Sequence, residues 1–365
     1  MSEPSRAVDE RWMRRALALA ERGAGQVAPN PKVGAVLVRD GVLVGEGWHP
    51  RFGGPHAEVM ALQAAGAAAR GATAYVSLEP CAHHGKTPPC TDALLAAGVA
   101  RVVCAVRDPN PLAAGGVDRL RAAGVAVTVG VLEAEARALN APFLFAARGE
   151  ARPFVTLKLA LSLDGGLVDA SRERGWLTGP VAREAVHALR AEADAVGVGI
   201  GTALADDPDL TVRLAPAPRV PPLRVVFDRQ GRLPLDGRLV RTAREVPVLV
   251  IMAPGGDGRA RRALESRGVA VVEAATLELA LGALRSRGVR HLLLEGGAGL
   301  ASAAMAAGVV DHLITFQAPV ILGRGLLPPF GALPPLTAAS APRLKVLARR
   351  TLGADLMTHY DVAGG

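Results

Sequence analysis

The stretch "GPHAEVMAL" at 54–62 places a histidine and a glutamate two positions apart at the start of an apolar run. Pro55 is favoured in the first turn of a helix, and the apolar residues after Glu58 continue one. A glutamate in a first turn stabilises a helix through its dipole, whatever the protein does. The pair His56 and Glu58 therefore indicates chemistry only if matching side chains occur elsewhere in the chain.

The matching residues stand in "EPCAHHGKTPPC" at 79–90. Together, His56, Cys81 and Cys90 offer one imidazole and two thiolates, and they leave the fourth position of a tetrahedral zinc ion open. Three protein ligands and a water are typical of catalytic zinc, whereas structural zinc has four protein ligands. Zinc lowers the pKa of the water that it binds. We therefore predict that Glu58 moves a proton from this water to a ring nitrogen and a departing amine, in a hydrolytic deamination.

The spacing of the two cysteines leaves an alternative open. Zinc deaminases have the signature H-x-E…P-C-x-x-C, but here eight residues separate the cysteines instead of two. His83 and His84 lie inside this insertion and are rival ligands that would close a structural site. The alternative is thus a non-catalytic scaffold that zinc stabilises.

Charge and composition limit the class of ligand. The formal net charge is +8, arginine is far more frequent than lysine, and aromatic residues make up 3% of the chain. A basic balance suits nucleic acid, small phosphorylated ligands, or no particular ligand in an arginine- and alanine-rich protein. Because few aromatics are available to stack on bases, we disfavour a second alternative, a nucleic-acid-editing deaminase fused to a binding domain.

The sequence does not predict a membrane or secreted protein. No apolar run reaches 18 residues, which argues against a membrane span. The segment "MSEPSRAVDERWMRRALALAERG" has a short apolar patch between charges of both signs, so it predicts an amphipathic helix and not a signal peptide. Three cysteines make no disulfide framework, and Cys104 stands in an apolar strand. We expect a cytoplasmic enzyme.

Helices and strands alternate through residues 1–147, which predicts a mixed α/β architecture. Asp40-Gly41 marks the turn of a hairpin between "KVGAVLV" and "VLVGEG". The strands "ATAYVSL", "RVVCAV" and "VAVTVG" follow. The expected helices lie near 9–23, 56–69, from Thr91, near 117–123 and from Glu133.

The alternation is interrupted at "ARGEARPFV" (147–155), where charge, glycine and proline gather. A length of 365 residues suggests two or three domains, and we place a boundary here, between a domain 1–147 and a domain 151–365. The second half again alternates, with proline-rich loops at 215–222 and 327–335. Its expected strands are "FVTLKLAL", "DAVGVG", "LRVVFD", "VPVLVIM", "VAVVE", "HLLLEGG" and "HLITFQ".

Several longer runs occur together and in a specific order. In the first half they are "PNPKVGAVLV", "HAE", "GATAYVSLEPCAHHGKTPPC", "ALLAAGVARVV" and "DPNP"; in the second they are "LKLALSLDG", "GWLT", "LADDPDLTVR" and "LEGGAGL". With these runs the chain resembles the bifunctional riboflavin-biosynthesis deaminase–reductase family over nearly its whole length. The longer insert between the cysteines belongs to this resemblance.

The resemblance implies a cytidine-deaminase-like fold for 1–147 and a dihydrofolate-reductase-like fold for the remainder. It implies that the first half, with one zinc per chain, removes the ring amine of a diamino-pyrimidinone that carries a ribosylamino phosphate. The second half then uses NADPH to open and reduce that ribose to a ribityl chain. The expected partner is this small phosphorylated pyrimidine, with no nucleic acid and no membrane, and we expect a homo-oligomer.

The resemblance also implies substrate contacts around the zinc. An asparagine offers both a donor and an acceptor to a pyrimidinone edge, and a lysine can contact a phosphate. Turn formation beside proline is the alternative for the two asparagines, and a solvated side chain is the alternative for the lysine. The expected contacts are Asn30, His49, Lys86, Asp108 and Asn110.

In the second half, the resemblance implies that NADPH contacts Ala160, Trp176, Thr202 and Asp206. It implies that the substrate contacts Arg190, Leu210, Arg213 and Glu295. Two arginines suit a phosphate, and a glutamate accepts from ribose hydroxyls. Trp176 as a core aromatic and Arg190 as a solvated helix residue are the alternatives.

Further residues are singled out by their own chemistry. Lys158 stands in an apolar strand, where an inward lysine requires a partner, and we expect it to bind substrate. Gly296, Gly297 and Gly299 join a strand to a helix and can meet a pyrophosphate, although they do not form the Rossmann fingerprint and also suit an ordinary turn. We hypothesise that Arg229 meets the 2′-phosphate of NADPH.

The chain departs from the family pattern at two places. Arg174 stands in "SRERGWLTG" where the family usually carries a serine that contacts substrate. We expect Arg174 to reach the substrate phosphate, with a solvated loop arginine as the alternative. After "DPNP" the chain reads "LAAGGVDRL", which is one residue shorter than the usual pattern, at the edge of the deaminase site.

Overall fold

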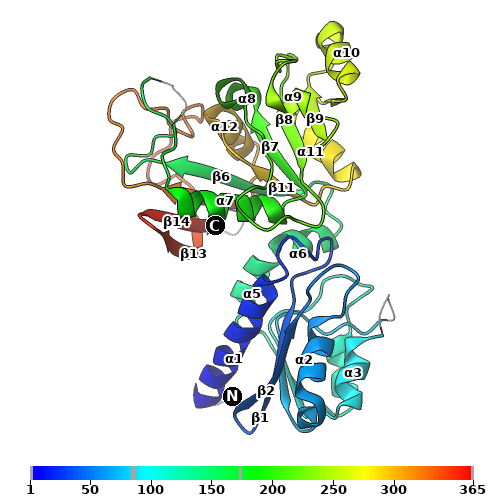
Figure 1. Cartoon of the computed structure of the whole chain (residues 1–365). Coiled ribbons are helices and arrows are strands. Elements are labelled where there is room, and N and C mark those ends of the chain that lie inside the picture. Colours follow the sequence, from blue (N-terminus) through cyan, green and yellow to red (C-terminus); the bar gives the residue numbers. More distant parts are fainter. Residues whose placement is uncertain (1–2, 84–87, 172–174, 363–365) are drawn as a thin grey trace. The chain divides into compact units, whose positions relative to one another are not determined.

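The computed structural model describes residues 3–83, 88–171 and 175–362. The chain divides into two compact units, Met1–Glu150 and Ala151–Gly365, which we call the N-terminal and C-terminal units (Figure 1). Each unit has its own sheet and its own hydrophobic clusters. The predicted mixed α/β architecture is confirmed.

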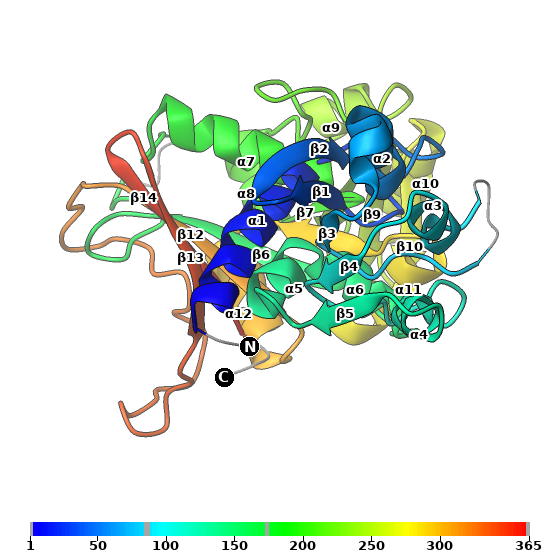
Figure 2. The ribbon, with the colours of Figure 1, turned by 90° about the horizontal axis from the view of Figure 1, so that it is seen from below.

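The described part of the N-terminal unit contains a five-stranded sheet in the order β2-β1-β3-β4-β5, which Figure 2 shows from one side. β1 pairs antiparallel with β2 and β3, while β3, β4 and β5 are parallel. The predicted hairpin turn is present, and both Asp40 and Gly41 have positive φ, as a tight two-residue turn requires. The strands are β1 (Gly34–Arg39), β2 (Val42–Trp48), β3 (Thr73–Val76), β4 (Arg101–Cys104) and β5 (Ala126–Val129).

Helices cover both faces of this sheet (Figures 1 and 2). Because side chains alternate along a strand, Val36 and Val38 of β1 pack in one cluster with Met13, while Ala35 and Leu37 pack in the other with Ala61. The first face is covered by α1 (Glu3–Glu21), α5 (Glu133–Leu139) and α6 (Ala141–Ala147). The second is covered by α2 (Ala57–Ala65), the 3₁₀ turn η1 (Gly66–Ala69), α3 (Cys90–Ala96) and α4 (Gly116–Ala122).

Two glycines of β2 bring this strand close to α2, the helix that carries Glu58. A Cβ added to Gly45 would lie 2.3 Å from the carbonyl oxygen of Ala61, and one added to Gly47 would lie 2.8 Å from that of Ala57. Both distances are too short for carbon and oxygen, so only glycine allows this packing. The first turn of α2 is thereby fixed against the sheet.

The C-terminal unit contains, in its described residues, a nine-stranded sheet in the order β10-β9-β8-β7-β11-β6-β12-β14-β13. All pairs from β10 to β12 are parallel, and the pairs β12·β14 and β14·β13 are antiparallel. The strands are β6 (Phe154–Leu161), β7 (Ala195–Gly199), β8 (Leu223–Phe227), β9 (Val248–Met252), β10 (Ala270–Glu273), β11 (His291–Leu294), β12 (His312–Gln317), β13 (Lys345–Leu352) and β14 (Asp355–Asp361).

Helices cover both faces of this sheet as well. On one face α11 (Leu277–Ser286) and α12 (Ala298–Ala306) pack on Leu157 and its neighbours. On the other face, α8 (Ile200–Asp206), α9 (Arg238–Arg241) and α10 (Gly258–Ser266) pack on a second cluster that includes Leu293. α7 (Pro180–Glu192) packs on Ile314 and Phe316 of β12. Lys158 is paired with Ile314 in the sheet, so it lies on the face that α7 covers.

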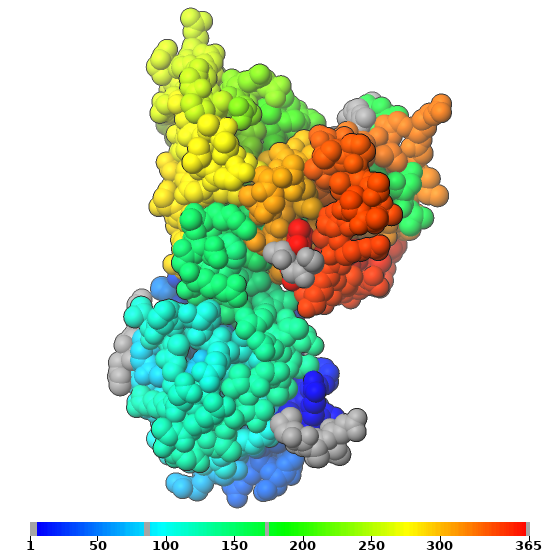
Figure 3. Space-filling model, turned by 180° about the vertical axis from the view of Figure 1, so that it is seen from behind, coloured from blue at the N-terminus to red at the C-terminus, as the bar shows by residue number. Residues whose placement is uncertain are grey.

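The hairpin of β13 and β14 was not among the predicted strands. β13 reads "KVLARRTL" and is mostly exposed, so its sequence has no alternation of buried and exposed residues to indicate a strand. It forms the edge of the sheet, and Figure 3 shows this orange-red segment at the surface. The expected helix 56–69 is also divided: α2 ends at Ala65, because the next residue, Gly66, has a φ of +53°, and η1 follows.

Candidate functional site

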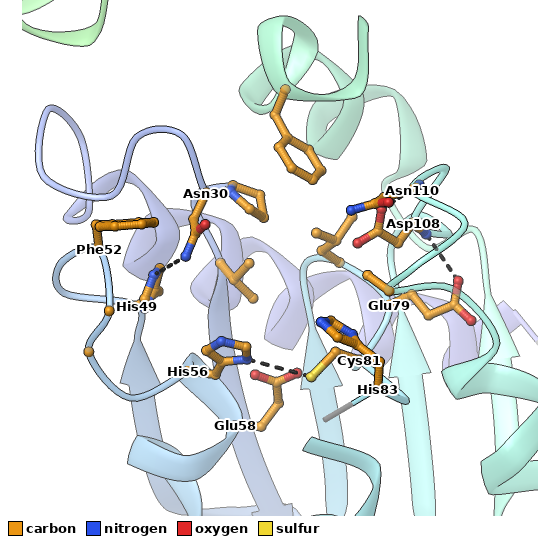
Figure 4. Close-up of a pocket in the computed structure, with 17 residues that line it drawn as sticks. Asn30, His49, Phe52, His56, Glu58, Glu79, Cys81, His83, Asp108 and Asn110 are labelled. Carbon is orange, nitrogen blue, oxygen red and sulfur yellow. Dashed lines mark hydrogen bonds between the residues drawn. The ribbon is translucent and has the colours of Figure 1, made fainter. Parts of the chain in front are cut away.

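The predicted zinc ligands come together where two helices begin. His56 precedes α2, Cys81 follows β3, and Cys90 is the first residue of α3. The Nδ1 atom of His56 lies 3.2 Å from the Sγ of Cys90 and 3.6 Å from the Sγ of Cys81. Figure 4 shows His56, Cys81 and Glu58 directed toward one another at the base of a cavity. Residues far apart in the sequence thus form one compact group.

The geometry of this group fits a zinc ion. Bond lengths of about 2.3 Å to sulfur and about 2.0 Å to nitrogen separate two tetrahedral ligands by roughly 3.5 Å, close to the observed spacing. The backbone N–H of Cys90 donates to the Sγ of Cys81 at 3.3 Å. The pKa of Cys81 is lowered to about 4, because the Cys90 thiol and then the imidazole of His56 hydrogen-bond to its sulfur. A thiolate is the form that binds metal.

The ligand group has three members. In the described ranges, His56, Cys81 and Cys90 are the one cluster of this kind whose ligand atoms all lie within 4.8 Å of one another. His83 lines the cavity but does not belong to the cluster, and His84 lies outside the described residues. Among the described residues, then, three side chains are placed to bind the ion.

Glu58 lies beside this group in the first turn of α2 and is only 4% exposed. Burial raises the pKa of its carboxyl group to about 7. A carboxyl group with such a pKa can both accept and release a proton near neutral pH. Its position and its pKa therefore suit general acid and base chemistry at the base of the cavity.

One wall of the cavity carries Asn30 and His49 (Figure 4). The Nδ1 of His49 lies 2.9 Å from the carbonyl oxygen of Pro55 and must donate to it, so the Nε2 is the acceptor. The Nδ2 of Asn30, at 3.1 Å from this Nε2, therefore donates. This orientation leaves the Oδ1 of Asn30 and its second N–H for a ligand. Burial lowers the pKa of His49, in keeping with a neutral ring.

The facing wall carries Asp108 and Asn110 (Figure 4). The Oδ1 of Asp108 accepts the backbone N–H of Asn110 at 2.9 Å, and the Oδ1 of Asn110 accepts that of Leu112 at 3.1 Å. These contacts form the turns that were the alternative role for Asn110. Burial raises the pKa of Asp108. Lys86, the remaining predicted contact, lies outside the described residues.

Glu79 is a residue of this site that the sequence reading did not single out. Its two carboxylate oxygens accept the backbone N–H groups of Asp108 at 3.0 Å and Val117 at 2.9 Å. The side chain is buried and lines the cavity of about 300 Å³. A charged residue within the apolar run "YVSLEPC" signals such a need for partners.

A second cavity, of about 820 Å³, lies in the C-terminal unit at the carboxyl ends of parallel strands. Ligands of open α/β sheets bind at such an edge. Most of the residues predicted to contact NADPH line this cavity, together with two of those predicted to contact substrate. They are Ala160, Thr202, Asp206, Arg229, Gly296, Gly297 and Gly299, and Lys158 and Glu295.

The glycines form the turn between β11 and α12 at this cavity. Gly296 and Gly297 have φ values of +68° and +82°, which disfavour any other residue. A Cβ on Gly297 would also lie 2.5 Å from the Oγ1 of Thr202. α12 begins at the next residue, so its first backbone N–H groups, and the positive end of its dipole, lie at the cavity. The turn fits an anionic group such as a pyrophosphate.

Lys158 and Glu295 form a charged group on the α7 face of the sheet. Glu295 pairs through both carboxylate oxygens with Arg190, with 2.8 Å between Oε2 and Nη2. Burial opposes ionisation of Glu295, but Arg190 and Lys158 outweigh it and lower its pKa. Burial lowers the pKa of Lys158, although Glu295 opposes this. Arg190 is therefore occupied by Glu295 and is not a solvated helix residue.

Several predicted residues of the C-terminal unit do not line the cavity. Trp176 is 70% exposed and lies beneath the guanidinium of Arg183, so it is not a core aromatic. Leu210 is buried. Arg213 forms an ion pair with Asp209 of the same loop. Arg174 lies outside the described residues. Arg229 lines the cavity and donates to the carbonyl oxygen of Ala275 at 3.1 Å.

The described helices differ from membrane-spanning helices in length or in apolar character. None of them combines the length and the apolar character that crossing a bilayer requires.

Two family descriptions match the chain, one in each unit. Residues 6–106 match the family described as the cytidine and deoxycytidylate deaminase zinc-binding region. Residues 153–358 match the family described as the RibD C-terminal domain. The predicted fold class, a deaminase-like unit followed by a reductase unit, is confirmed.

Curated relatives match over most of the chain. The chain is 43% identical to the riboflavin biosynthesis protein RibD of Aquifex aeolicus, over 88% of this chain and 90% of that protein. It is 43% identical to RibD of Escherichia coli, over 96% of this chain and 98% of that protein.

Solved structures match as well. RibD of Acinetobacter baumannii has 41% identity and a TM-score of 0.80, with 98% of this chain and 99% of that chain covered. A deaminase/reductase from Thermotoga maritima has 36% identity and a TM-score of 0.81, with 98% and 100% covered. That protein is named as a diaminohydroxyphosphoribosylaminopyrimidine deaminase and 5-amino-6-(5-phosphoribosylamino)uracil reductase.

Proposed function

The chain belongs to the RibD family of bifunctional riboflavin-biosynthesis enzymes, deaminase and reductase in one chain, and we propose how its two sites work. The N-terminal unit removes the ring amine of 2,5-diamino-6-(5-phosphoribosylamino)pyrimidin-4-one. The C-terminal unit reduces the ribosyl group of the product to ribityl with NADPH. The observation that carries the proposal is the cluster of His56, Cys81 and Cys90 beside the buried Glu58.

His56, Cys81 and Cys90 would hold one zinc ion, which when bound supplies the Lewis acidity that activates a water molecule. Glu58 takes the first proton that the attacking water loses and delivers it to the ring nitrogen. It then carries the second proton, from the new hydroxyl group on the ring carbon, to the amine, which leaves as ammonia. Burial keeps this carboxyl group away from bulk water, so the proton stays at the site. Its pKa of about 7 suits both transfers.

The cavity walls would orient the pyrimidinone. Asn30 offers one acceptor and one donor to the ring edge, and its direction is fixed by His49. Asp108 and Asn110 bound the opposite side. We assign Lys86, by family resemblance, to the substrate phosphate. The cavity of about 300 Å³ matches one small ligand and not a polynucleotide.

The cavity of about 820 Å³ would hold NADPH, which supplies a hydride when bound. The glycine turn and α12 meet its pyrophosphate, and Arg229 meets its 2′-phosphate. Lys158 and Glu295 contact the ribose, with Glu295 held by Arg190. The family resemblance further assigns NADPH contacts to Ala160, Trp176, Thr202 and Asp206, and substrate contacts to Arg174, Arg190, Leu210 and Arg213.

The test is to supply the diamino-pyrimidinone phosphate with and without NADPH and to identify the products. Without NADPH, we expect release of ammonia and accumulation of the deaminated ribosyl compound. With NADPH, the ribityl compound replaces it. A zinc-stabilised scaffold would bind zinc and release no ammonia, and an editing deaminase would prefer a polynucleotide.

Replacing Cys81 tests the ligand set directly. The purified protein should carry about one zinc per chain. Cys81→Ser should lose most of its zinc and its deaminase activity, because an alcohol is a far poorer zinc ligand than a thiolate. Cys104→Ser is the matched control, since Cys104 is buried and donates to the carbonyl oxygen of Val106. Full zinc occupancy and unchanged turnover in Cys81→Ser would refute the assignment.

A further inference from the structure

The loop 207–213 of the C-terminal unit, which follows α8, has an unusual backbone. Asp207 and Leu210 have φ values of +38° and +54°, a region that residues other than glycine avoid. Leu210 is nevertheless buried, with 2% of its surface exposed. A loop in this conformation persists only where contacts from other elements hold it.

Three buried or half-buried side chains from outside the loop supply these contacts. Arg224 of β8 donates to the carbonyl oxygen of Asp209 at 3.3 Å, and Arg190 of α7 donates to that of Thr211 at 2.9 Å. His187, also on α7, receives the backbone N–H of Arg213 on its Nδ1 at 3.0 Å. The loop is thus held at alternate residues. The contact at Arg213 requires that the Nδ1 of His187 carries no proton and can accept a hydrogen bond.

His187 can make this contact only as a neutral ring with its proton on Nε2. It is buried on the face of α7 that also carries Arg190, one helical turn further on. Burial, together with the nearby Arg190 and Arg213, lowers the pKa of His187 to about 4. The acceptor lone pair on Nδ1 is therefore present at neutral pH.

The hydrogen bond from its backbone N–H to His187 fixes the position from which the side chain of Arg213 extends. Its guanidinium lies 3.1 Å from the carboxylate of Asp209 and 2.8 Å from the hydroxyl of Thr211, in both cases through Nη1. The side chain is about half exposed, and in the described part of the chain its ion pair and its hydrogen bond both involve Nη1. Its remaining N–H groups are available to an anion such as a phosphate.

We propose that His187 is a positioning residue of the reductase site, which fixes the backbone of Arg213 so that its guanidinium is presented to the phosphate of the substrate. This rests on the proposed function, in which Arg213 contacts substrate. His187 itself then touches no reacting atom. Its loss should weaken substrate binding and leave the chemical step intact.

The test compares three replacements of His187 in the full-length protein, with pre-deaminated substrate and NADPH. His187→Asn places an amide oxygen near the position of Nδ1 and keeps the acceptor, whereas His187→Gln places it near Nε2 and His187→Phe has none. We expect Gln and Phe to raise the reductase KM about tenfold, as the loss of one hydrogen bond does, with kcat within about twofold. The Asn variant should remain within about threefold of wild type.

Two further measurements separate the possible failures. Arg213→Ala should raise KM at least as much and remove the preference for phosphorylated over dephosphorylated substrate. If Arg213→Ala has no effect, the proposed role of Arg213 fails, and the role of His187 fails with it. If Arg213→Ala is impaired while His187→Phe and His187→Gln behave as wild type, the proposal for His187 alone is overturned.

Controls distinguish positioning from other roles. A fall in kcat of similar size in all three His187 variants would overturn the proposal in favour of direct catalysis. The deaminase rate of each variant, measured on the same preparation, should equal that of wild type. Glu184→Gln on the exposed face of α7 should change neither KM nor kcat. Loss of the Asn rescue together with loss of folding would show a structural role only and would equally overturn the proposal.

Discussion

Glu58 occupies a position in which a carboxylate is expensive to keep ionised. It is buried, and burial raises its pKa to about 7. A glutamate needed only for the helix dipole would be equally effective at an exposed position in the first turn. Its buried placement beside Cys90 and His56 therefore favours our proposal that Glu58 transfers protons over a role in helix stability alone.

Replacing Glu58 with glutamine separates these two roles. The amide keeps the size of the side chain but cannot take a proton, so Glu58→Gln should retain zinc and lose about 10²-fold or more in deaminase rate. Metal content and turnover are measured on the same sample. Normal deamination by this variant would mean that Glu58 serves the helix alone.

The candidate metal ligands of the site could be predicted from residue types alone. Zinc is bound by only a few types of side chain. His56, Cys81 and Cys90 could therefore be assigned to one site, although His56 and Cys90 are 34 positions apart in the sequence. The neutral tautomer of His49 and the direction of Asn30 could not be predicted, because both depend on the carbonyl oxygen of Pro55. Every residue has a backbone carbonyl group, so the residue types do not indicate which carbonyl group forms such a hydrogen bond.

Among the elements, Glu79 links the segment that carries Cys81 to the loop that carries Asp108. It accepts one backbone N–H at each end of the loop 108–117. Gly116 allows the close approach, since a Cβ there would lie 1.7 Å from the carbonyl oxygen of Pro80. The wall of the cavity is thus held to the segment after β3 that carries Cys81, a proposed zinc ligand.

Replacing Glu79 with glutamine should loosen this wall. The amide nitrogen cannot accept, so one buried N–H loses its partner, at a cost of about 1.5–3 kcal/mol for a bond to a charged group. We expect Glu79→Gln to lower the unfolding free energy of the N-terminal unit and raise the deaminase KM while zinc is retained. Glu133→Gln, which affects an exposed pair with Arg137, is the matched control and should change stability by less than about 0.5 kcal/mol. Equal behaviour of the two variants would contradict this role of Glu79.

A second prediction at this scale concerns β12 and β14. The Nδ1 of His312 lies 2.8 Å from the Nε2 of His359, and burial lowers the pKa of His312 to about 3. Below pH 6.5 the unfolded chain binds a proton at His312 that the folded chain does not, so stability falls from pH 6.5 toward 3. A pKa difference of one between the folded and unfolded states corresponds to about 1.4 kcal/mol. The loss of unfolding free energy due to His312 therefore reaches a few kcal/mol when the pH falls from 6.5 to 3.

The measurement is the unfolding free energy of the full-length protein in urea at several pH values between 6.5 and 4. Wild type should lose more stability over this range than His312→Gln, which carries no titrating ring. Parallel curves for the two proteins would show that His312 is protonated equally in the folded and unfolded states.

The elements were predictable where burial leaves a periodic pattern. The apolar strands of both sheets were identified because their side chains are buried. The strand β13 was not, because an exposed edge strand needs no apolar alternation. The order of the strands follows from pairings between distant segments, such as β11 between β6 and β7. A single sequence does not specify such pairings.

In the whole molecule, the division at residue 150 separates the residues of the candidate deaminase site from those of the candidate reductase site. The proposed zinc ligands and Glu58 all lie in Met1–Glu150, and the glycine turn, Lys158 and Glu295 all lie in Ala151–Gly365. Among the described residues, each hydrophobic cluster is formed by one unit: two by the N-terminal unit and three by the C-terminal unit. Each unit therefore has the core that independent folding requires.

We predict that residues 151–365, produced alone, fold and reduce pre-deaminated substrate with NADPH. Its own sheet and clusters supply the stability, and its cavity is lined by residues of this unit alone. In the full-length chain, Glu58→Gln should abolish deamination and leave the reductase kcat and KM unchanged. Cooperative unfolding of the fragment, together with its reductase kinetics, checks the first point. A fragment that folds but does not reduce, or a reductase that is lost with Glu58→Gln, would mean that the two sites depend on each other.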